Sequence, residues 1–240
     1  MSRYKPLNLL NNKDFWPEKA AIVDAIKEVL TIGKCRMPLP ISDFGRFRDP
    51  QWRNEDNELV PYQSVDWYVY DALNRERMQV DVQQVLHSFA VEPWRRERAL
   101  GDHYDLCVMD EDMFDSRRPP DAPDAGYVVG RAQPLTAAVI STYRLEHIWG
   151  MPYSYLKTEV MRQLCFMFGV PDPARDDVTV VADTAYCTNT CILRPAFVAP
   201  DDWGTLTEDR LACGALCEGC TEGLRRFFRQ AARERHARRR

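Results

Sequence analysis

The chain has 240 residues, of which 45% are hydrophobic and 28% are charged, a composition typical of a globular protein with a full hydrophobic core. It contains no apolar run of the ~18 residues needed for a membrane span and no apolar signal core at its N-terminus, so we expect neither a membrane protein nor a secreted one. The net charge of −4 is uneven, because residues 225–240 contain eight Arg and one Glu, which is +7 and leaves −11 for the rest.

The first part of the chain predicts two helical regions on either side of an irregular segment. Pro17 suits the first turn of a helix that runs to about Leu30, because alanine, isoleucine and valine recur on one face. Residues 35–63 are rich in proline, arginine and aromatic residues without a steady period, which indicates a loop that packs on its own domain or forms a partner-binding surface. Residues 64–89 return to a helical pattern, and we expect His87 on its second apolar face to be a structural side chain.

Short strands are predicted in the middle of the chain. Residues 104–109 predict a core strand. The acidic residues that follow it at 110–115 are expected to cap the strand exit, because they lack the Asp-x-Asp-x-Asp-Gly pattern of a calcium loop. Residues 127–130 and 138–142 predict two further strands, and Gly130 indicates a bulge or a close approach of another element.

Residues 157–168 predict a buried helix, since apolar side chains recur along one face at helical spacing. Gly169 suits the position just after a helix end, and Pro171 cannot continue the helix, which indicates a sharp stop. The run Val178–Ala182 then predicts a strand.

The order of these segments carries a resemblance to a known family. The matching segments are Leu106–Phe114, Tyr127–Ala132, Ala138–Leu145, the helix at 157–168, Cys187–Leu193 and Cys217–Cys220. In this order they resemble the archaemetzincins, a family of zinc metalloproteases, over roughly residues 60–228. The resemblance implies an α+β, metzincin-like fold, in which helices pack on a mixed β-sheet and a cysteine-rich zinc-binding subregion follows.

The resemblance also implies a division of the chain. We expect an α+β body with an N-terminal extension at 1–186, a cysteine-rich subregion of the same domain at 187–228, and an Arg-rich tail at 229–240. Relative to the family, residues 174–186 are an insertion, which we interpret as a hairpin that covers the cleft.

The predicted helix departs from the family at every catalytic position. The family carries H-E-x-x-H-x-x-G-x-x-H, and aligning Gly169 with the motif glycine puts Arg162 and Phe166 at the first two histidines, Gln163 at the glutamate and Asp172 at the third histidine. A catalytic zinc needs three protein ligands and an open position for water. Arginine stays protonated, phenylalanine has no lone pair, and glutamine cannot act as a general base. We therefore expect no catalytic zinc and no peptidase chemistry at this helix.

Cysteine spacing is the strongest chemical signal in the chain. Two close pairs suit one tetrahedral structural zinc: Cys187 and Cys191, then Cys217 and Cys220. The archaemetzincins carry a four-cysteine zinc of this kind, whose first cysteine is replaced here by Pro173, and Cys187 is placed to substitute for it. Cys213 is a spare that could replace any of the four, and free thiols are the alternative to a metal site.

These features predict a catalytically inactive archaemetzincin-like protein that acts as a structural or protein-interaction subunit of a larger assembly and contains one structural Zn²⁺. One alternative is an active zinc metalloprotease with unusual ligands, such as Asp172 and His147. Another is a zinc-containing nucleic-acid-binding module, with the Arg-rich tail on nucleic acid or on an acidic protein surface. We expect no membrane partner and a cytoplasmic location, with a mitochondrial location as the alternative.

Overall fold

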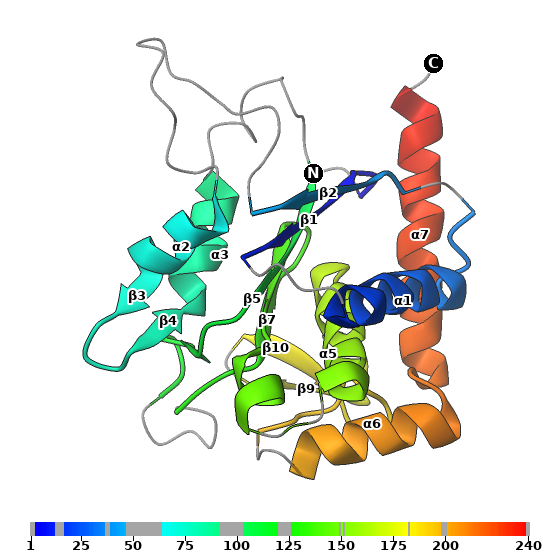
Figure 1. Cartoon of the computed structure of the whole chain (residues 1–240). Helices are drawn as coiled ribbons and strands as arrows, with labels where there is room; N and C mark the ends of the chain where they lie inside the picture. Colours follow the sequence, from blue (N-terminus) through cyan, green and yellow to red (C-terminus); the bar gives the residue numbers. More distant parts are fainter. Residues whose placement is uncertain are drawn as a thin grey trace.

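A five-stranded sheet forms the centre of the fold, in the spatial order β2-β1-β5-β8-β7 (Figure 1). Its strands are β1 (Leu7–Asn11), β2 (Ile41–Gly45), β5 (Tyr104–Met109), β7 (Gly130–Gln133) and β8 (Ala137–Ser141). The first four in space pair in parallel, whereas β7 runs antiparallel to β8 at one edge. The computed structural model describes residues 3–12, 17–36, 39–46, 64–91, 103–119, 126–148, 150, 152–181, 183–197 and 201–238.

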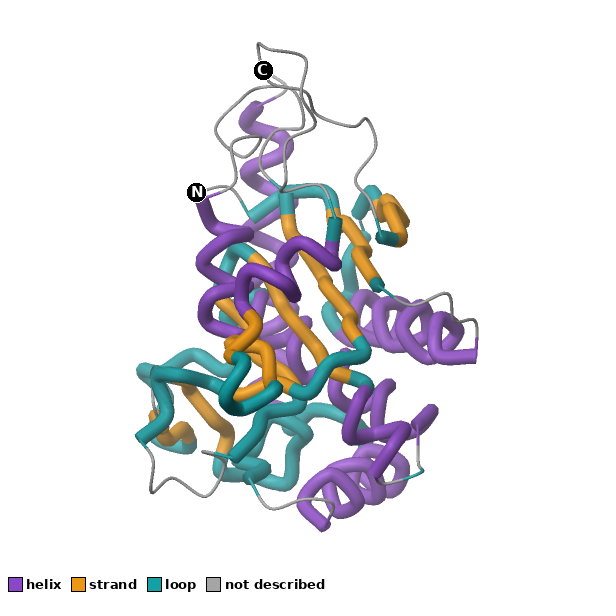
Figure 2. The backbone as a smooth tube through the Cα atoms, turned by 60° about the vertical axis from the view of Figure 1, so that its left-hand side comes forward, coloured by secondary structure: helices purple, strands orange, loops and turns teal. Residues whose placement is uncertain are grey.

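Alternate side chains of the central strands belong to two separate hydrophobic cores, one on each face of the sheet. Leu106 and Val108 of β5 belong to one core, and Cys107 and Met109 belong to the other. All six residues of β5 are buried, as expected for a parallel strand covered on both faces. Figure 2 shows the strands side by side, with helices on both flanks of the sheet.

Two pairs of helices cover the two faces. On one face α1 (Pro17–Ile32) packs along α5 (Pro152–Met167), and on the other α2 (Val65–Ala72) and α3 (Val82–Val91) build the second core (Figure 1). The chain ends with α6 (Asp201–Cys213) and the long α7 (Glu218–Arg238), whose last turns extend beyond the sheet.

Smaller elements complete the structure. The remaining ones are β3 (Leu73–Asn74), β4 (Gln79–Asp81) and β6 (Met113–Phe114), the hairpin of β9 (Val178–Val181) with β10 (Thr184–Cys187), and a π-helical turn, η2 (Arg144–Ile148). Within the described residues, every helix is too short or too polar to cross a bilayer.

The fold is mixed α+β, as the sequence predicts, and several boundaries differ. The helical prediction over 64–89 is wrong in its middle, where β3 and β4 separate α2 from α3 and Met78 turns the chain with a φ of +52°. The predicted strand at 127–130 lies three residues later, because Val128 makes only an isolated bridge to Met113. The irregular segment at 35–63 contains the unexpected strand β2, and its residues 47–63 lie outside the described part. The division at residue 186 stays a prediction.

Candidate functional site

Helix α5, for which the sequence analysis expects the place of the family's catalytic helix, lies against the edge strand β7. A Cβ atom at Gly130 of β7 would stand 2.5 Å from Oε1 of Glu159 and 2.9 Å from Cγ of Gln163. Real Cβ contacts are longer than this, so only glycine lets the strand approach the helix here. The close approach predicted for Gly130 is therefore confirmed, and the neighbouring element is helix α5.

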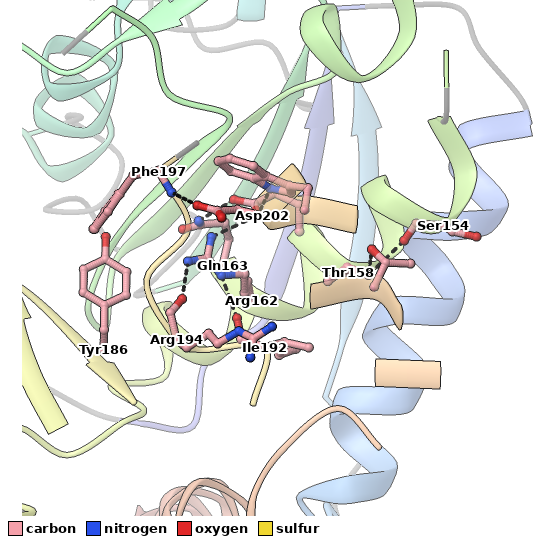
Figure 3. A network of polar contacts seen from close by, with 12 residues as sticks. Ser154, Thr158, Arg162, Gln163, Tyr186, Ile192, Arg194, Phe197 and Asp202 are labelled. Carbon is pink, nitrogen blue, oxygen red and sulfur yellow. Dashed lines mark hydrogen bonds and ion pairs between the residues drawn. The ribbon is translucent and has the colours of Figure 1, made fainter. Parts of the chain in front are cut away.

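Arg162 is buried with an exposed fraction of 3%, and each of its three guanidinium nitrogens donates a hydrogen bond. Its Nε donates to the carbonyl of Ile192 at 2.7 Å, and one Nη donates to the carbonyl of Arg194 at 2.9 Å (Figure 3). The other Nη lies 3.2 Å from a carboxylate oxygen of Glu159. The side chain therefore ties α5 to the loop at 192–194 by hydrogen bonds that use the cation as a donor.

Glu159 is the acceptor at the centre of this network, and sequence reasoning missed it. Its Oε1 accepts from Gln163 at 2.7 Å, and its Oε2 accepts from Trp203 Nε1 at 3.0 Å as well as from Arg162. The signal was present, because Glu159 stands three and four residues before Arg162 and Gln163, the spacing of side chains on one helix face. A fully buried carboxylate is stable here because a cation and two neutral donors surround it.

Aromatic side chains occupy the remaining space. Phe166 meets Tyr186 of β10 edge to face, with ring centroids 5.6 Å apart. The Tyr186 hydroxyl accepts a hydrogen bond from Arg118 at 3.1 Å. The cavity between α5, β7 and β10 measures about 20 Å³, which is room for about one water molecule. The hairpin predicted near residues 174–186 is therefore present and packs on α5 at Phe166, and its status as an insertion stays a prediction.

The structure does not bring Asp172 and His147 to this place. Asp172 follows α5 with a side chain 41% exposed, accepts from the backbone of Ala174 and lies 3.5 Å from Arg226. His147 is 50% exposed and lies 3.2 Å from Asp110. Neither is among the described residues that line the cavity at Arg162 and Phe166.

The four predicted cysteines, in contrast, come together. The Sγ atoms of Cys187, Cys191, Cys217 and Cys220 all lie within 4.8 Å of one another. The Sγ atoms of Cys187 and Cys217 are 3.6 Å apart, close to the edge of about 3.8 Å in a tetrahedron with Zn–S bonds of about 2.3 Å. The spare, Cys213, is exposed at the end of α6 and lies outside the group. The cluster joins the end of β10 to the start of α7 and could hold a metal ion.

A cation and an amide stand beside these sulfur atoms. One Nη of Arg175 lies 3.2 Å from Sγ of Cys220, and Nδ2 of Asn189 lies 3.8 Å from Sγ of Cys217. Asp177 pairs with Arg175 and also accepts from Asn189 at 2.6 Å, which fixes both donors. Sequence reasoning missed these residues, since nothing in their local pattern points to sulfur.

The absence of a side chain at Gly219 leaves space for the guanidinium of Arg175. A Cβ atom there would stand 2.4 Å from one Nη of Arg175, a distance that real Cβ contacts do not reach. The cation therefore lies directly on the backbone between Cys217 and Cys220.

The protonation of the thiols is uneven. The hydrogen bond from Cys220 lowers the pKa of Cys191 to about 6, and burial raises the pKa of Cys187 to about 11. The same hydrogen bond, in which the Cys220 thiol is the donor, and burial raise the pKa of Cys220. Cys191 thus gives up its proton more readily than Cys187 and Cys220, which would release protons on binding a metal.

One comparison with known proteins links part of the chain to a family. The chain is 27% identical over 111 residues to archaemetzincin from Nanoarchaeum equitans (strain Kin4-M), a match that covers 46% of each of the two proteins. The chain thus spans about half the length of this relative. No family model matches the chain, and no solved structure matches it. The match supports a distant archaemetzincin-like relationship for that part of the chain.

Proposed function

We propose that this chain is an archaemetzincin-like protein without peptidase activity, which acts as a structural or protein-interaction subunit and is stabilised by one zinc ion. The observation that carries the proposal is the buried guanidinium of Arg162, at the helix position that aligns with the family's first catalytic histidine. Its donors are committed to Ile192, Arg194 and Glu159. A cation so placed repels a metal ion instead of binding it.

The other parts of a peptidase site are also missing from the helix. Gln163 cannot take a proton from water, and its amide is used to bind Glu159. Phe166 supplies no lone pair and packs on Tyr186. The cavity beside Arg162 and Gln163 measures about 20 Å³, which leaves no room for a peptide at these two positions. These facts favour a structural role for α5 over an active enzyme with substitute ligands.

Zinc is the metal that suits the cysteine cluster best. Four sulfur ligands near tetrahedral spacing favour Zn²⁺, and a site closed by four protein ligands is structural, since no position stays open for water. Bound there, the ion would supply a crosslink between β10 and α7. Arg175 would offset part of the negative charge of a four-thiolate site.

A metal count combined with a peptidase assay tests the proposal. Protein purified without added metal is expected to contain one zinc per chain, as measured by elemental analysis, and to show no zinc-dependent cleavage of a casein substrate. The double variant Cys217→Ser, Cys220→Ser should lose the zinc, and the control Cys213→Ser should keep it.

Each contrary result has a clear meaning. Zinc-dependent cleavage that disappears in Gln163→Ala would show that the helix is catalytic. A chain that contains no zinc would reduce the four cysteines to ordinary thiols and remove the crosslink from the proposal.

A further inference from the structure

A basic pocket of about 320 Å³ lies between the end of α1 and the middle of α7. Its cations are Lys34 and Arg36, just after α1, and Arg225 and Arg229 of α7, and Phe228 forms part of its wall. Among the described residues that line the pocket, none is acidic. In Figure 1 the end of α1 lies beside α7, so the pocket joins two segments that are almost 200 residues apart in the sequence.

Two contacts hold the walls of the pocket together. A Cβ atom at Gly33 would stand 2.4 Å from the ring of Phe228, so glycine is needed for α1 to end against α7. The Nε of Arg225 donates to the carbonyl of Ile32 at 3.3 Å, which satisfies a terminal carbonyl of α1. The pocket is therefore part of the packed structure.

Lys34, which lines the pocket, has an unfavourable backbone conformation. The end of α1 is closed by hydrogen bonds from Cys35 to Leu30 at 2.9 Å and from Lys34 to Thr31 at 3.0 Å, the pattern in which the residue at the Lys34 position is usually glycine. Lys34 has a φ of +50°, which a side chain with a Cβ atom disfavours. The fold thus accepts backbone strain at a position that places a cation on the pocket.

We propose that the basic pocket binds an acidic segment of a partner protein, with carboxylates on the four cations and an apolar side chain in the space between them. We choose an acidic partner because of charge complementarity, since four cations line this pocket and none of its described lining residues is acidic. Glu222, which pairs with Arg229, does not block the site, because both side chains are more than half exposed and such a pair is weak.

Two observations favour an acidic peptide over nucleic acid. Phe228 is only 4% exposed, so its ring offers no free face on which a base could stack. The −11 charge of residues 1–224 repels a long polyanion that runs beyond the pocket. A short acidic segment fits within a Debye length of about 8 Å from the cations and avoids most of that repulsion.

Fluorescence anisotropy with a labelled heptapeptide, three glutamates on each side of a leucine, tests the proposal on the full chain. The triple variant Lys34→Gly, Arg36→Gln, Arg229→Gln should weaken binding about tenfold, since each exposed charge pair contributes modestly. The matched control Lys27→Gln, Arg226→Gln, Arg233→Gln removes the same charges from α1 and α7 outside the pocket and should stay within about twofold of the wild type.

Lys34→Gly alone separates binding from folding. It should bind the peptide more weakly while unfolding at the same temperature as the wild type or higher, because glycine relieves the strain at this φ. A variant that binds like the wild type would remove Lys34 from the site.

Several results would overturn the proposal. The first is that the peptide does not bind. The second is that the triple variant and its control lose the same amount of affinity. The third is that inorganic phosphate competes as strongly as unlabelled peptide. A labelled oligo-dT that binds more tightly than the peptide and loses affinity in the triple variant would assign the pocket to nucleic acid. None of these readouts depends on zinc or on peptidase activity.

Discussion

The guanidinium of Arg162 and the carboxylate of Glu159 form a buried ion pair at 3.2 Å. Replacing Arg162 by methionine should leave Glu159 as a buried charge with only two neutral donors, at a cost of about 3–5 kcal/mol in the free energy of unfolding. Urea denaturation followed by circular dichroism measures this loss. The double variant Arg162→Met, Glu159→Gln should recover part of it, since no charge is then buried.

The double variant tests whether the loss of stability comes from the unpaired charge of Glu159. A single-variant loss below about 1 kcal/mol would show that the pair is not buried in solution. A loss without recovery in the double variant would indicate that Arg162 acts through its backbone partners Ile192 and Arg194 alone.

The guanidinium of Arg175 contacts the cysteine cluster at Cys220. Arg175→Gln should keep a hydrogen-bond donor near Cys220 but remove the positive charge that offsets the thiolates, so zinc affinity should fall roughly tenfold. Competition with a chelator of known affinity measures the change. Arg226→Gln is the control, because Arg226 lies on α7, as Cys220 does, and pairs with Asp172 at the surface. An unchanged affinity would show that Arg175 serves only its pair with Asp177.

At the scale of elements, Asp115 links the end of β6 to β7 through Arg131, with an Oδ2–Nε distance of 2.6 Å. Burial by itself would raise the pKa of Asp115, but the hydrogen bond and the charge of Arg131 lower it below its usual value. A lowered carboxyl pKa stabilises the folded state above the unfolded value of about 3.9 and loses that contribution as the pH falls through the folded value.

Comparing the wild type with Asp115→Asn across pH tests this link. The wild type should be more stable by about 2 kcal/mol near pH 7, and the difference should shrink below about pH 4. Urea titrations at several pH values give the two curves. A difference that does not vary between pH 3 and 7 would contradict the role of the ion pair.

Element by element, the predictable parts are those whose local pattern matches their burial. The strand at 104–109 is apolar at every position except Asp105 because both of its faces are covered, and the sequence predicts it to the residue. The strand β2 could not be found in this way, since its residues are half-buried or exposed at a sheet edge and carry no apolar pattern. The β3–β4 turn was missed because helical spacing continues through Met78, where the structure has a positive φ.

The candidate site shows the same limit. Sequence spacing within each cysteine pair predicted two pairs of sulfur ligands, and the structure brings them together. The contact of Arg175 with Cys220 joins residues 45 positions apart, and only the packing of Gly219 against the guanidinium makes it possible. Distances of this kind are set by the whole fold, so no local pattern could predict them.

At the scale of the whole molecule, the cysteine cluster brings distant parts of the chain together. Cys187 ends the hairpin and Cys191 follows it, and both meet Cys217 and Cys220 at the start of α7. From there α7 passes the end of α1. A ligand that binds only the folded state adds its binding free energy to stability. The proposed zinc should therefore stabilise the hairpin and α7 together.

Metal removal is the measurement that checks this coupling. A strong chelator should lower the unfolding temperature of the wild type by about 10 °C, which corresponds to roughly 3–4 kcal/mol for a chain of this size. Cys213→Ser should respond like the wild type, since its side chain lies outside the cluster. Cys217→Ser should start at a lower temperature and respond little, because the site is already incomplete. Equal unfolding temperatures of the wild type with and without chelator would show that no metal holds the two parts together.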